Sequence, residues 1–410
     1  MGASLRLLDV AGCNITPHGA QALAEAFASG CCSQLQELCL SGNNIGPEGG
    51  AAVFHSLEYV PLLQHLLMAN VSFDTTSVHI LTDVLARGNM PELTFLDVSG
   101  NNVQVSPICS VLAKQLSRLN LSNNIIGSMG GERHLGPRLA VLTKLEHLNI
   151  SSSFVGNRGV GAIIQGAPTT IKTLDLSDNN VSEDGVHLIV ARLRDSGFPV
   201  LRVFNLNGNY CAARAAVCLA ECLVSGALPM VEELHLAGNA IGNDGVSALA
   251  DAFQLGWGRH LRILDVSSNS FNSVGASRLA QSLKTACPLL KELKLQLNCV
   301  DDSGATALAE SLNARSSLSL RRLDVSDNIL GDDGLCDLAD ALSQTQYAQL
   351  DTLNISHNRL GLHAFTKFVS RFQDRSCPRN LDVSHTVYAD METIRTVASR
   401  LRGKNCRVTL

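Results

Sequence analysis

Hydrophobic and polar positions recur along this chain with a period of about 29 residues. The clearest copy is 320–331, which reads Leu-Arg-Arg-Leu-Asp-Val-Ser-Asp-Asn-Ile-Leu-Gly. Its first leucine-type position returns, mostly at steps of 28 to 30 residues, at Leu5, Leu35, Leu63, Leu93, Leu116, Leu145, Ile171, Leu201, Val231, Leu261, Leu290, Leu320 and Leu350. A degenerate copy follows at 381–383, and a last apolar strand lies at 408–410. Self-similarity at a fixed period is the signature of a repeat solenoid, here with about 14 repeats.

Each copy predicts a short strand, a turn and a helix. Apolar residues two apart, such as Leu174 and Leu176, predict a half-buried strand. A G-x-x-G unit then precedes apolar residues at helical spacing, as in 242–253, which predicts an amphipathic helix. We therefore expect an α/β fold in which a parallel sheet lies on one side and the helices lie on the other.

An asparagine follows most of the predicted strands. Buried at a turn, its amide can bond backbone groups that no strand ladder satisfies. We expect a structural ladder made by Asn43, Asn101, Asn124, Asn179, Asn209, Asn239, Asn269, Asn298, Asn328 and Asn358. In the other copies the place is held by Cys13, Val71, Ser153 and Thr386. The ladder should be weaker at those four positions.

This strand–turn–helix unit resembles the leucine-rich repeat of the ribonuclease-inhibitor type, and the resemblance covers practically all 410 residues. The family's fold implies a horseshoe-shaped solenoid with a parallel β-sheet on the concave face and helices on the convex face. We expect a single domain over residues 1–410, because each repeat of a solenoid contacts mainly its neighbours. The resemblance implies protein binding rather than catalysis.

The repeat is least regular at 103–137. The residues at 103–107 replace the usual G-x-x-G, so the helix after them should be short. The glycine-rich residues 127–131 are expected to open a loop, and Gly136-Pro137 should start the next helix, with proline in its first turn. Such a break is consistent either with extra contacts to a partner or with sequence drift.

Cysteine usage and the lack of targeting signals favour a cytoplasmic protein. Most of the 13 cysteines fall at interior repeat positions, such as Cys109, Cys218 and Cys336, which is typical of a reducing compartment. We recognise no signal peptide, since a repeat already begins at Leu5. No apolar run approaches the roughly 20 residues of a membrane span.

Two sets of outward strand positions are candidate protein-binding residues. In the first repeats these positions are apolar at Leu7, Leu67 and Phe95, and exposed apolar clusters often mark interfaces. The alternative is that these side chains pack against their neighbours. In later repeats His235, Lys294 and Arg322 interrupt a ladder of Asp and Asn. They form either a basic spot or, as we favour, cross-strand charge pairs.

The region 367–410 forms a basic C-terminal tip on a chain whose formal net charge is −5. It carries nine Lys and Arg residues, including Arg400, Arg402 and Lys404, against four acidic ones. A basic surface can dock an acidic protein surface. Nucleic acid is an unlikely ligand, because the basic residues are not interleaved with aromatic ones.

We find no pattern typical of an active site. The G-x-x-G units recur in the repeats and belong to their geometry, and no nucleophile motif or metal-ligand cluster is present. The acidic pairs 183–184, 301–302 and 332–333 stand where helices should begin, where acids complement the helix dipole. We expect no catalytic residue, cofactor, metal or small-molecule substrate.

These observations predict a non-catalytic protein-binding scaffold subunit of a large intracellular assembly, with one or more protein partners and no membrane. Neither end shows a clearly polar cap, so the ends are either covered by other subunits or stable without caps. Similar repeat proteins are frequent in motile cilia, which implies by analogy the axoneme, in a radial spoke or a dynein-regulatory link. The cytoskeletal location is thus an analogy.

Two other functions remain open. The first is a soluble regulator of a small GTPase or another enzyme, similar to Ran GTPase activators, which use the same repeat class. That resemblance implies an arginine in an early loop, but 16–19, 46–49 and 73–76 contain none. The second is a component of a mitochondrial ribosome-type particle.

Overall fold

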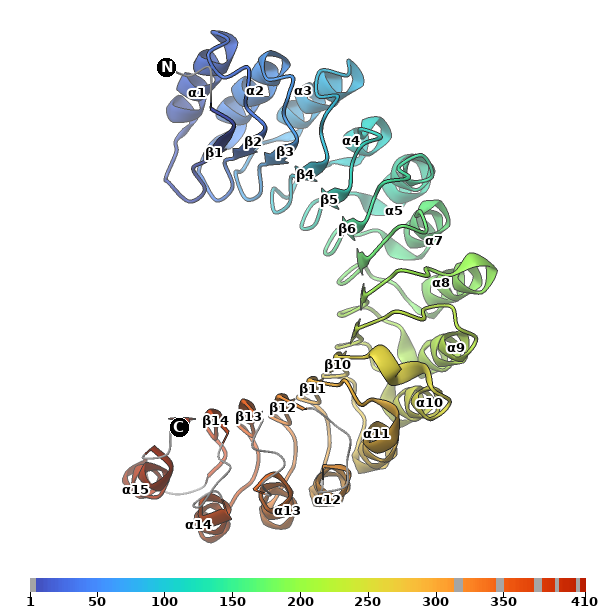
Figure 1. The fold of residues 1–410 in the computed structure, drawn as a ribbon, viewed down its shortest axis with the longest axis vertical. Coiled ribbons are helices and arrows are strands. Elements are labelled where there is room, and N and C mark those ends of the chain that lie inside the picture. Colours follow the sequence, from blue (N-terminus) through green and yellow to red (C-terminus); the bar gives the residue numbers. More distant parts are fainter. Residues whose placement is uncertain (1–4, 313–319, 344–349, 372–377, 388–390, 403–405) are drawn as a thin grey trace. The chain divides into compact units, whose positions relative to one another are not determined.

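The chain forms two compact units, residues 1–203 and 204–410. The computed structural model describes residues 5–312, 320–343, 350–371, 378–387, 391–402 and 406–410. Each unit is a solenoid with its strands along one side and its helices along the other (Figure 1). The prediction of a single domain stays a prediction.

The first unit contains seven strands in chain order. They are β1 (Leu7–Asp9), β2 (Glu37–Cys39), β3 (His65–Leu67), β4 (Phe95–Asp97), β5 (Arg118–Asn120), β6 (His147–Asn149) and β7 (Thr173–Asp175). The helical segments between and after them are α1 (Pro17–Ala28), α2 (Gly46–Ser56), η1 (Leu57–Tyr59), α3 (Thr75–Ala86), α4 (Ser106–Val111), α5 (Gly127–Gly130), η2 (Gly131–Leu135), α6 (Gly136–Leu139), α7 (Gly156–Gly166) and α8 (Glu183–Ser196).

The second unit repeats the plan, and β8 (Val203–Asn205) lies at the boundary. Its other strands are β9 (Glu233–His235), β10 (Ile263–Asp265), β11 (Glu292–Lys294), β12 (Arg322–Asp324), β13 (Thr352–Asn354), β14 (Asn380–Asp382) and β15 (Arg407–Thr409). Its helical segments are α9 (Ala212–Val224), α10 (Gly242–Gln254), η3 (Trp257–His260), α11 (Ser273–Ala286), α12 (Asp302–Ser311), α13 (Asp332–Leu342), α14 (Leu362–Arg371) and α15 (Met391–Arg402).

Within each unit every strand pairs in parallel with its neighbours in the sequence. In the first unit Leu8 of β1 is level with Leu38 of β2. In the second unit Leu264 of β10 is level with Leu293 of β11. Of these middle residues Leu38, Leu264 and Leu293 are buried and Leu8 is half-buried, whereas the first and third residues of the strands alternate to the other face. The predicted fold class, an α/β leucine-rich repeat solenoid with a parallel sheet, is confirmed.

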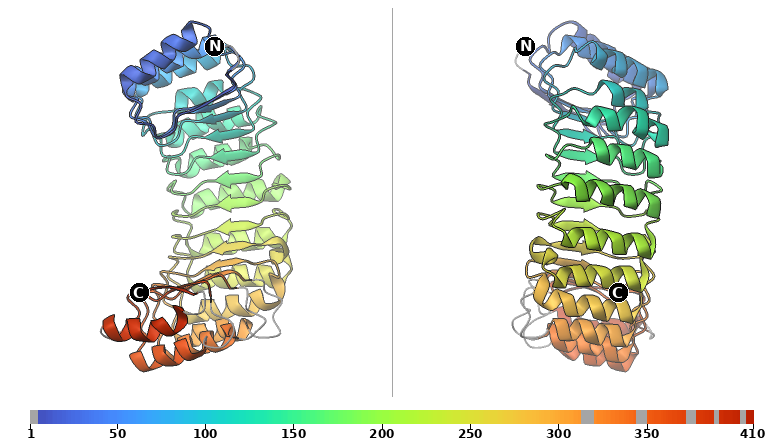
Figure 2. Two further views of the ribbon diagram at one scale, coloured as in Figure 1. Left: turned by 60° about the vertical axis from the view of Figure 1, so that its left-hand side comes forward. Right: turned by 90° about the vertical axis from the view of Figure 1, so that its right-hand side faces the viewer.

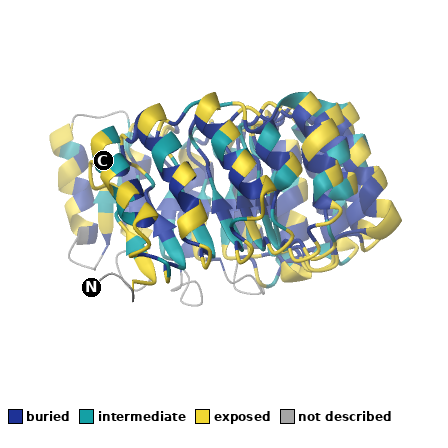
Figure 3. Cartoon of the chain, turned by 90° about the horizontal axis from the view of Figure 1, so that it is seen from above, coloured by how far each residue is buried: buried dark blue, intermediate teal, exposed yellow. Residues whose placement is uncertain are grey.

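The core lies between the sheet and the helices. In α10 the buried residues Val246, Leu249 and Phe253 are three and four positions apart, as an amphipathic helix requires. Figure 3 shows buried and exposed residues alternating along the helices in this way. The two turned views of Figure 2 show the helices of each unit stacked side by side in chain order. Each helix therefore packs against the helices of neighbouring repeats.

The irregular region of the first unit differs from our expectation in one respect. Helix α4 has six residues and is short, as predicted. The expected loop at 127–131 is wrong, because α5, the π-helical turn η2 and α6 make residues 127–139 helical. Gly130, Gly131 and Gly136 permit close packing here: a Cβ on Gly136 would lie 2.6 Å from the carbonyl oxygen of Ala162 in α7. The sequence alone does not show whether a glycine lies in a turn or permits close packing between helices.

The acidic pairs lie at helix starts, as predicted. Helices α8 and α13 begin with such a pair. Asp301 caps α12 and accepts a hydrogen bond from the backbone N–H of Ser303 at 2.9 Å. In the described part of the chain, no group of acids, histidines or cysteines has the geometry of a metal site. Nor do the described helices include one long and apolar enough to span a bilayer.

Candidate functional site

The ladder asparagines join neighbouring repeats. The Nδ2 of Asn43 donates to the carbonyl oxygens of Leu40 in its own repeat, at 2.8 Å, and of Val10 in the preceding repeat, at 2.9 Å. Its Oδ1 accepts from the N–H of Ile15 at 2.9 Å. In the second unit Asn269 makes equivalent bonds, including one of 2.8 Å to the carbonyl oxygen of Leu236. These buried amides satisfy backbone groups in the turns.

Two of the substituted ladder positions keep part of this bonding. The hydroxyl of Ser153 donates toward the carbonyl oxygens of Leu121 and Ser151, at 3.4 and 3.1 Å. Thr386 does the same toward Ile355 and Ser384, at 2.8 and 3.2 Å. A hydroxyl has one proton where an amide has two, so each of these turns is tied by fewer donors.

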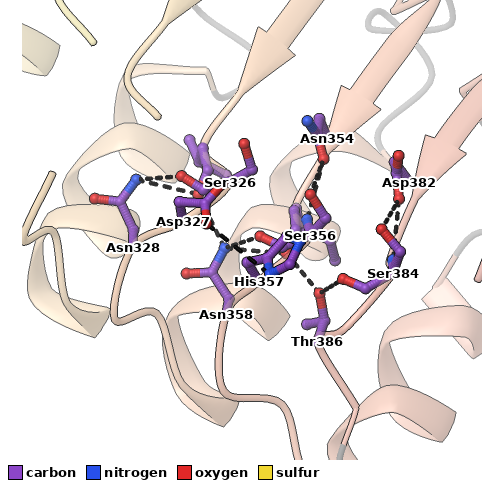
Figure 4. Close-up of polar contacts among 12 residues, drawn as sticks. Ser326, Asp327, Asn328, Asn354, Ser356, His357, Asn358, Asp382, Ser384 and Thr386 are labelled. Atoms are coloured by element: carbon purple, nitrogen blue, oxygen red, sulfur yellow. Dashed lines mark hydrogen bonds and ion pairs between the residues drawn. The ribbon is translucent and has the colours of Figure 1, made fainter. Parts of the chain in front are cut away.

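In most repeats, the Asp or Asn at the third position of the strand accepts hydrogen bonds from the residue two positions later in the turn. In β10 the carboxylate Oδ1 of Asp265 accepts from the hydroxyl of Ser267 at 2.6 Å. Figure 4 shows the same contact in β14, where Ser384 donates to Asp382 at 2.8 Å. These acids are occupied by their own turns. A ladder of Asp and Asn on this face is therefore explained without a partner.

The repeat of β11 departs from this pattern at three places. Lys294 stands where its neighbours have Asp, and Gln296 stands where they have Ser. The side-chain Oε1 of Gln296 is buried and makes no hydrogen bond within the described residues. Leu297 has φ +57°, in a turn position with a left-handed backbone that other repeats fill with Gly, Asn, Ser, Asp or His. Its side chain is 56% exposed.

Ion pairs replace the missing cap beside β11. Glu292 of β11 lies between two cations: its Oε1 is 3.4 Å from Lys294 Nζ, and its Oε2 is 3.0 Å from Arg322 Nη1 on β12. Lys294 also lies 3.7 Å from Asp265 Oδ2 on β10. The favoured interpretation of these positions, cross-strand charge pairing, agrees with this arrangement. The structure brings Lys294 and Arg322 together around one acid.

His235 of β9 belongs to the same network through Asp265. Burial lowers the pKa of His235, but hydrogen bonds to Asp265 and Glu233 outweigh burial, and the net effect is a raised pKa. Burial raises the pKa of Asp265, but the bonds from His235 and Ser267 and the charge of Lys294 lower it overall. Each group therefore favours the charged form of the other.

A second row of charges lies at the start of the same strands. The residues that directly precede β9 to β14 are all charged: Glu232, Arg262, Lys291, Arg321, Asp351 and Arg379. Arg262 pairs with Glu232 at 2.8 Å. Asp351 is approached by Arg321 at 3.7 Å and by Arg379 at 3.5 Å. This acid, like Glu292, is thus shared by two cations.

A shallow hollow of about 290 Å³ lies between the residues that precede these strands and the first residues of the strands themselves. It is lined by Glu233, Arg262, Ile263, Lys291, Glu292, Arg321, Arg322 and Asp351. Ile263 is half-buried and supplies its apolar part. The arrangement offers charge and one apolar surface, which suits non-covalent recognition.

Comparisons with known proteins agree with this repeat architecture. The family described as Leucine Rich repeat matches residues 3–24, 31–54, 167–190, 227–250, 259–280, 286–309 and 316–339. The ribonuclease inhibitor of Sus scrofa is 26% identical over 380 residues, covering 77% of this chain and 81% of the relative. That of Mus musculus is 28% identical over 356 residues, covering 78% and 75%.

The chain is a leucine-rich repeat protein of the ribonuclease-inhibitor-like class. The capping protein, Arp2/3 and myosin-I linker protein 2 of Mus musculus also resembles it, at 27% identity over 330 residues. That similarity covers 66% of this leucine-rich repeat protein but only 24% of the relative. The repeats therefore recur inside a much longer chain.

The apolar positions of the first unit do not form one cluster. Leu7 is 53% exposed, but Glu37 and His65 separate it from Phe95 in the same register row. The Phe95 ring lies 4.9 Å from the guanidinium of Arg118 and 6.0 Å from the ring of His65. Leu67 is half-buried on the other row. An apolar interface at these residues stays a prediction.

The basic tip is described in part. Arg400 is exposed on α15, while Lys404 and the side chain of Arg402 lie outside the described residues. Arg371 pairs with Asp340 of α13 at 2.7 Å, so one of the tip's cations is engaged by an acid outside it. Docking through Arg400, Arg402 and Lys404 stays a prediction.

The charged row before the strands was not predicted from the sequence. Lys294 and Arg322 stand out in the sequence because they interrupt a ladder, whereas Arg262, Lys291 and Arg321 interrupt none. The signal was present: one repeat position, read through six consecutive copies, is charged each time. Alignment of the repeats at that position would have found it.

Proposed function

We propose that this leucine-rich repeat protein is a non-catalytic scaffold that binds protein partners within a large intracellular assembly. One observation carries the proposal: in the repeat of β11 the self-contained Asp–Ser cap is absent, and a network of shared ion pairs takes its place. A surface whose charges are not consumed by its own turns is suited to a partner.

The test measures the native size of the protein after gentle lysis. We expect full-length protein in a fraction of very high mass, from which raised salt releases it, because exposed charge pairs are screened. The strand-face variant Lys294→Glu/Arg322→Glu should leave that fraction. Arg278→Glu is the matched control, since Arg278 pairs with Asp251 on the helix side at 2.8 Å. A free monomer of 43.6 kDa in every lysate contradicts the proposal.

The motile cilium is the assembly that we propose, by analogy with other repeat proteins of cilia. The protein would then belong to a radial spoke or a dynein-regulatory link. Imaging the tagged protein in multiciliated cells tests this location. Uniform cytoplasmic signal with no enrichment in axonemes refutes the ciliary assignment and leaves the scaffold proposal intact.

Regulation of a soluble enzyme is a second candidate, supported by the two relatives named ribonuclease inhibitor. Under this function the protein runs with one small partner, and the size measurement separates the two proposals. A ribonuclease assay with added purified protein tests whether the enzyme that it regulates is a ribonuclease. Because each shared acid on β11–β13 carries two cations, we expect no inhibition of a basic ribonuclease.

A further inference from the structure

The strand face of the second unit carries a cationic strip. We define it by the side chains Arg262, Lys291, Lys294, Arg321, Arg322 and Arg379. In the parallel sheet, neighbouring strands lie about 4.8 Å apart, so the row before the strands presents charges at that spacing. Lys291 is exposed and, within the described residues, makes no ion pair.

The cations of the strip are more exposed than the acids with which they pair. Where Arg322 meets Glu292, the side chains are 64% and 16% exposed. Where Arg379 meets Asp351, they are 79% and 35% exposed. Since each of the two acids serves two cations, guanidinium N–H groups remain for an outside acceptor. In these two pairs the cation is the more exposed partner, so an approaching chain meets the guanidinium first.

The chemistry of the strip favours carboxylates on a protein chain. Guanidinium groups bind carboxylates with two parallel hydrogen bonds, which gives specificity as well as charge. The hollow also holds the half-buried Ile263, which can receive one apolar side chain. The residues that line the hollow include no aromatic ring, so bases of a nucleic acid would find nothing to stack on.

We propose that the cationic strip binds an acidic, extended segment of a partner protein that crosses β10 to β13. Carboxylates of the segment contact Lys291, Arg321 and Arg322, and one apolar side chain rests on Ile263. Alternate residues of an extended segment face the same side about 6.6–7 Å apart, so its acids should stand at alternate positions. The inference rests on the proposed protein-binding function and names its partner class.

The test uses purified full-length protein and labelled peptides in fluorescence anisotropy. The probe is Leu-Ser-Glu-Ser-Glu-Ser-Glu, in which Leu and the acids share one face of an extended segment. It is compared with a version in which Leu is Ser and one in which every Glu is Lys. We expect the acidic probe to bind, the Ser version to bind several-fold more weakly, and the Lys version not to bind. Affinity should fall as salt rises.

Variants locate the binding site. Lys291→Glu should weaken binding of the probe about 10-fold, as expected for reversing an interfacial charge. It removes no ion pair of the described fold, so misfolding is not an alternative explanation. Lys291→Gln should weaken binding less than Lys291→Glu, and Arg278→Glu should leave it unchanged. Equal binding by Lys291→Glu and the wild-type protein, or no binding of the acidic probe at all, overturns the inference.

Three further outcomes are informative: the first tests for nucleic acid, and the other two keep the inference separate from the function on which it rests. An RNA oligonucleotide of equal charge that binds more tightly than the peptide assigns the strip to nucleic acid and overturns the proposal. If Lys291→Glu abolishes probe binding but the native protein runs as a free monomer, the inference stands and the scaffold function fails. If Lys291→Glu binds the probe normally while the native protein stays in a large assembly, the scaffold function stands and the inference about the strip fails.

Discussion

The side-chain amide of Asn43 donates to the carbonyl oxygen of Val10, 2.9 Å away in the preceding repeat. With its bonds to Leu40 and Ile15, this one side chain satisfies three backbone groups. Its sequence neighbour Asn44 is exposed. Of two adjacent asparagines in one repeat, one is thus buried and hydrogen-bonded and the other is exposed to solvent.

This contrast predicts the energetic weight of the ladder. Asn43→Ala leaves three backbone groups without their partner, at about 1–3 kcal/mol each, and should lower the free energy of unfolding by about 3 kcal/mol or more. Asn44→Ala should change it by less than about 0.5 kcal/mol. Urea unfolding of the two variants measures both. Similar losses for the two would mean that the ladder contributes little.

Leu297 predicts a stabilising substitution. A side chain with a left-handed backbone costs about 1–2 kcal/mol, and Leu297 is exposed, so little packing offsets this cost. Leu297→Gly should raise the free energy of unfolding by about 1 kcal/mol. The control is Leu255→Gly, because Leu255 is 71% exposed with φ −77°. A gain there, or a loss at Leu297, contradicts the explanation.

The pair His235 and Asp265 predicts a pH dependence of stability. Because the pKa of His235 is raised in the folded state, its contribution is complete below about pH 6.5 and is lost as pH rises through the folded pKa. Because the pKa of Asp265 is lowered, its contribution is present above about pH 3.9 and is lost as pH falls through the folded pKa.

The matching measurement is urea unfolding between pH 5.5 and 8.5. His235→Gln should cost about 1.5 kcal/mol more at pH 5.5 than at pH 8.5, which is the lower end of the range for a hydrogen bond to a charged group. In an Asp265→Asn background that difference should shrink, because the main acceptor is gone. A cost that does not vary with pH refutes this account of the network.

The close contact of α6 with α7 predicts intolerance at Gly136. An added methyl group would lie 2.6 Å from a backbone oxygen, which a rotamer change cannot relieve. Gly136→Ala should therefore destabilise the first unit by about 2–3 kcal/mol. Gly19→Ala is the control: its Cβ would lie 3.1 Å from Cγ2 of Ile15 and 3.9 Å from Oγ1 of Thr16, and it would meet no backbone atom. It should stay within about 1 kcal/mol of the wild-type protein, as read from hydrogen exchange.

Much of the fold could be predicted because its signals are local. Leu174 and Leu176 mark a strand by their spacing alone, and Asp301 marks a helix start by its chemistry. The helix start at Gly136 was predicted, but the helical residues 127–131 could not be predicted in this way. A glycine such as Gly131 is typical of a turn, and only the position of Gly159 shows that it permits close packing.

The candidate site was predicted only where it breaks a pattern. Lys294 interrupts the Asp and Asn ladder and was recognised. Lys291 stands at a position without a fixed residue type, where acids and bases both occur. Its relation to Arg321 depends on the parallel register of β11 and β12, in which the residues before the strands are neighbours. Register, rather than composition, defines this surface.

The reach of each ladder asparagine sets how the molecule responds to mechanical load. Asn328 bonds to Leu295 one repeat back and to Val325 within its own repeat. We therefore expect a chain under tension to yield one repeat at a time, with about 100 Å of extended polypeptide released per repeat. Under force, such a solenoid should unfold in steps of one repeat, while the repeats that are still folded keep their structure.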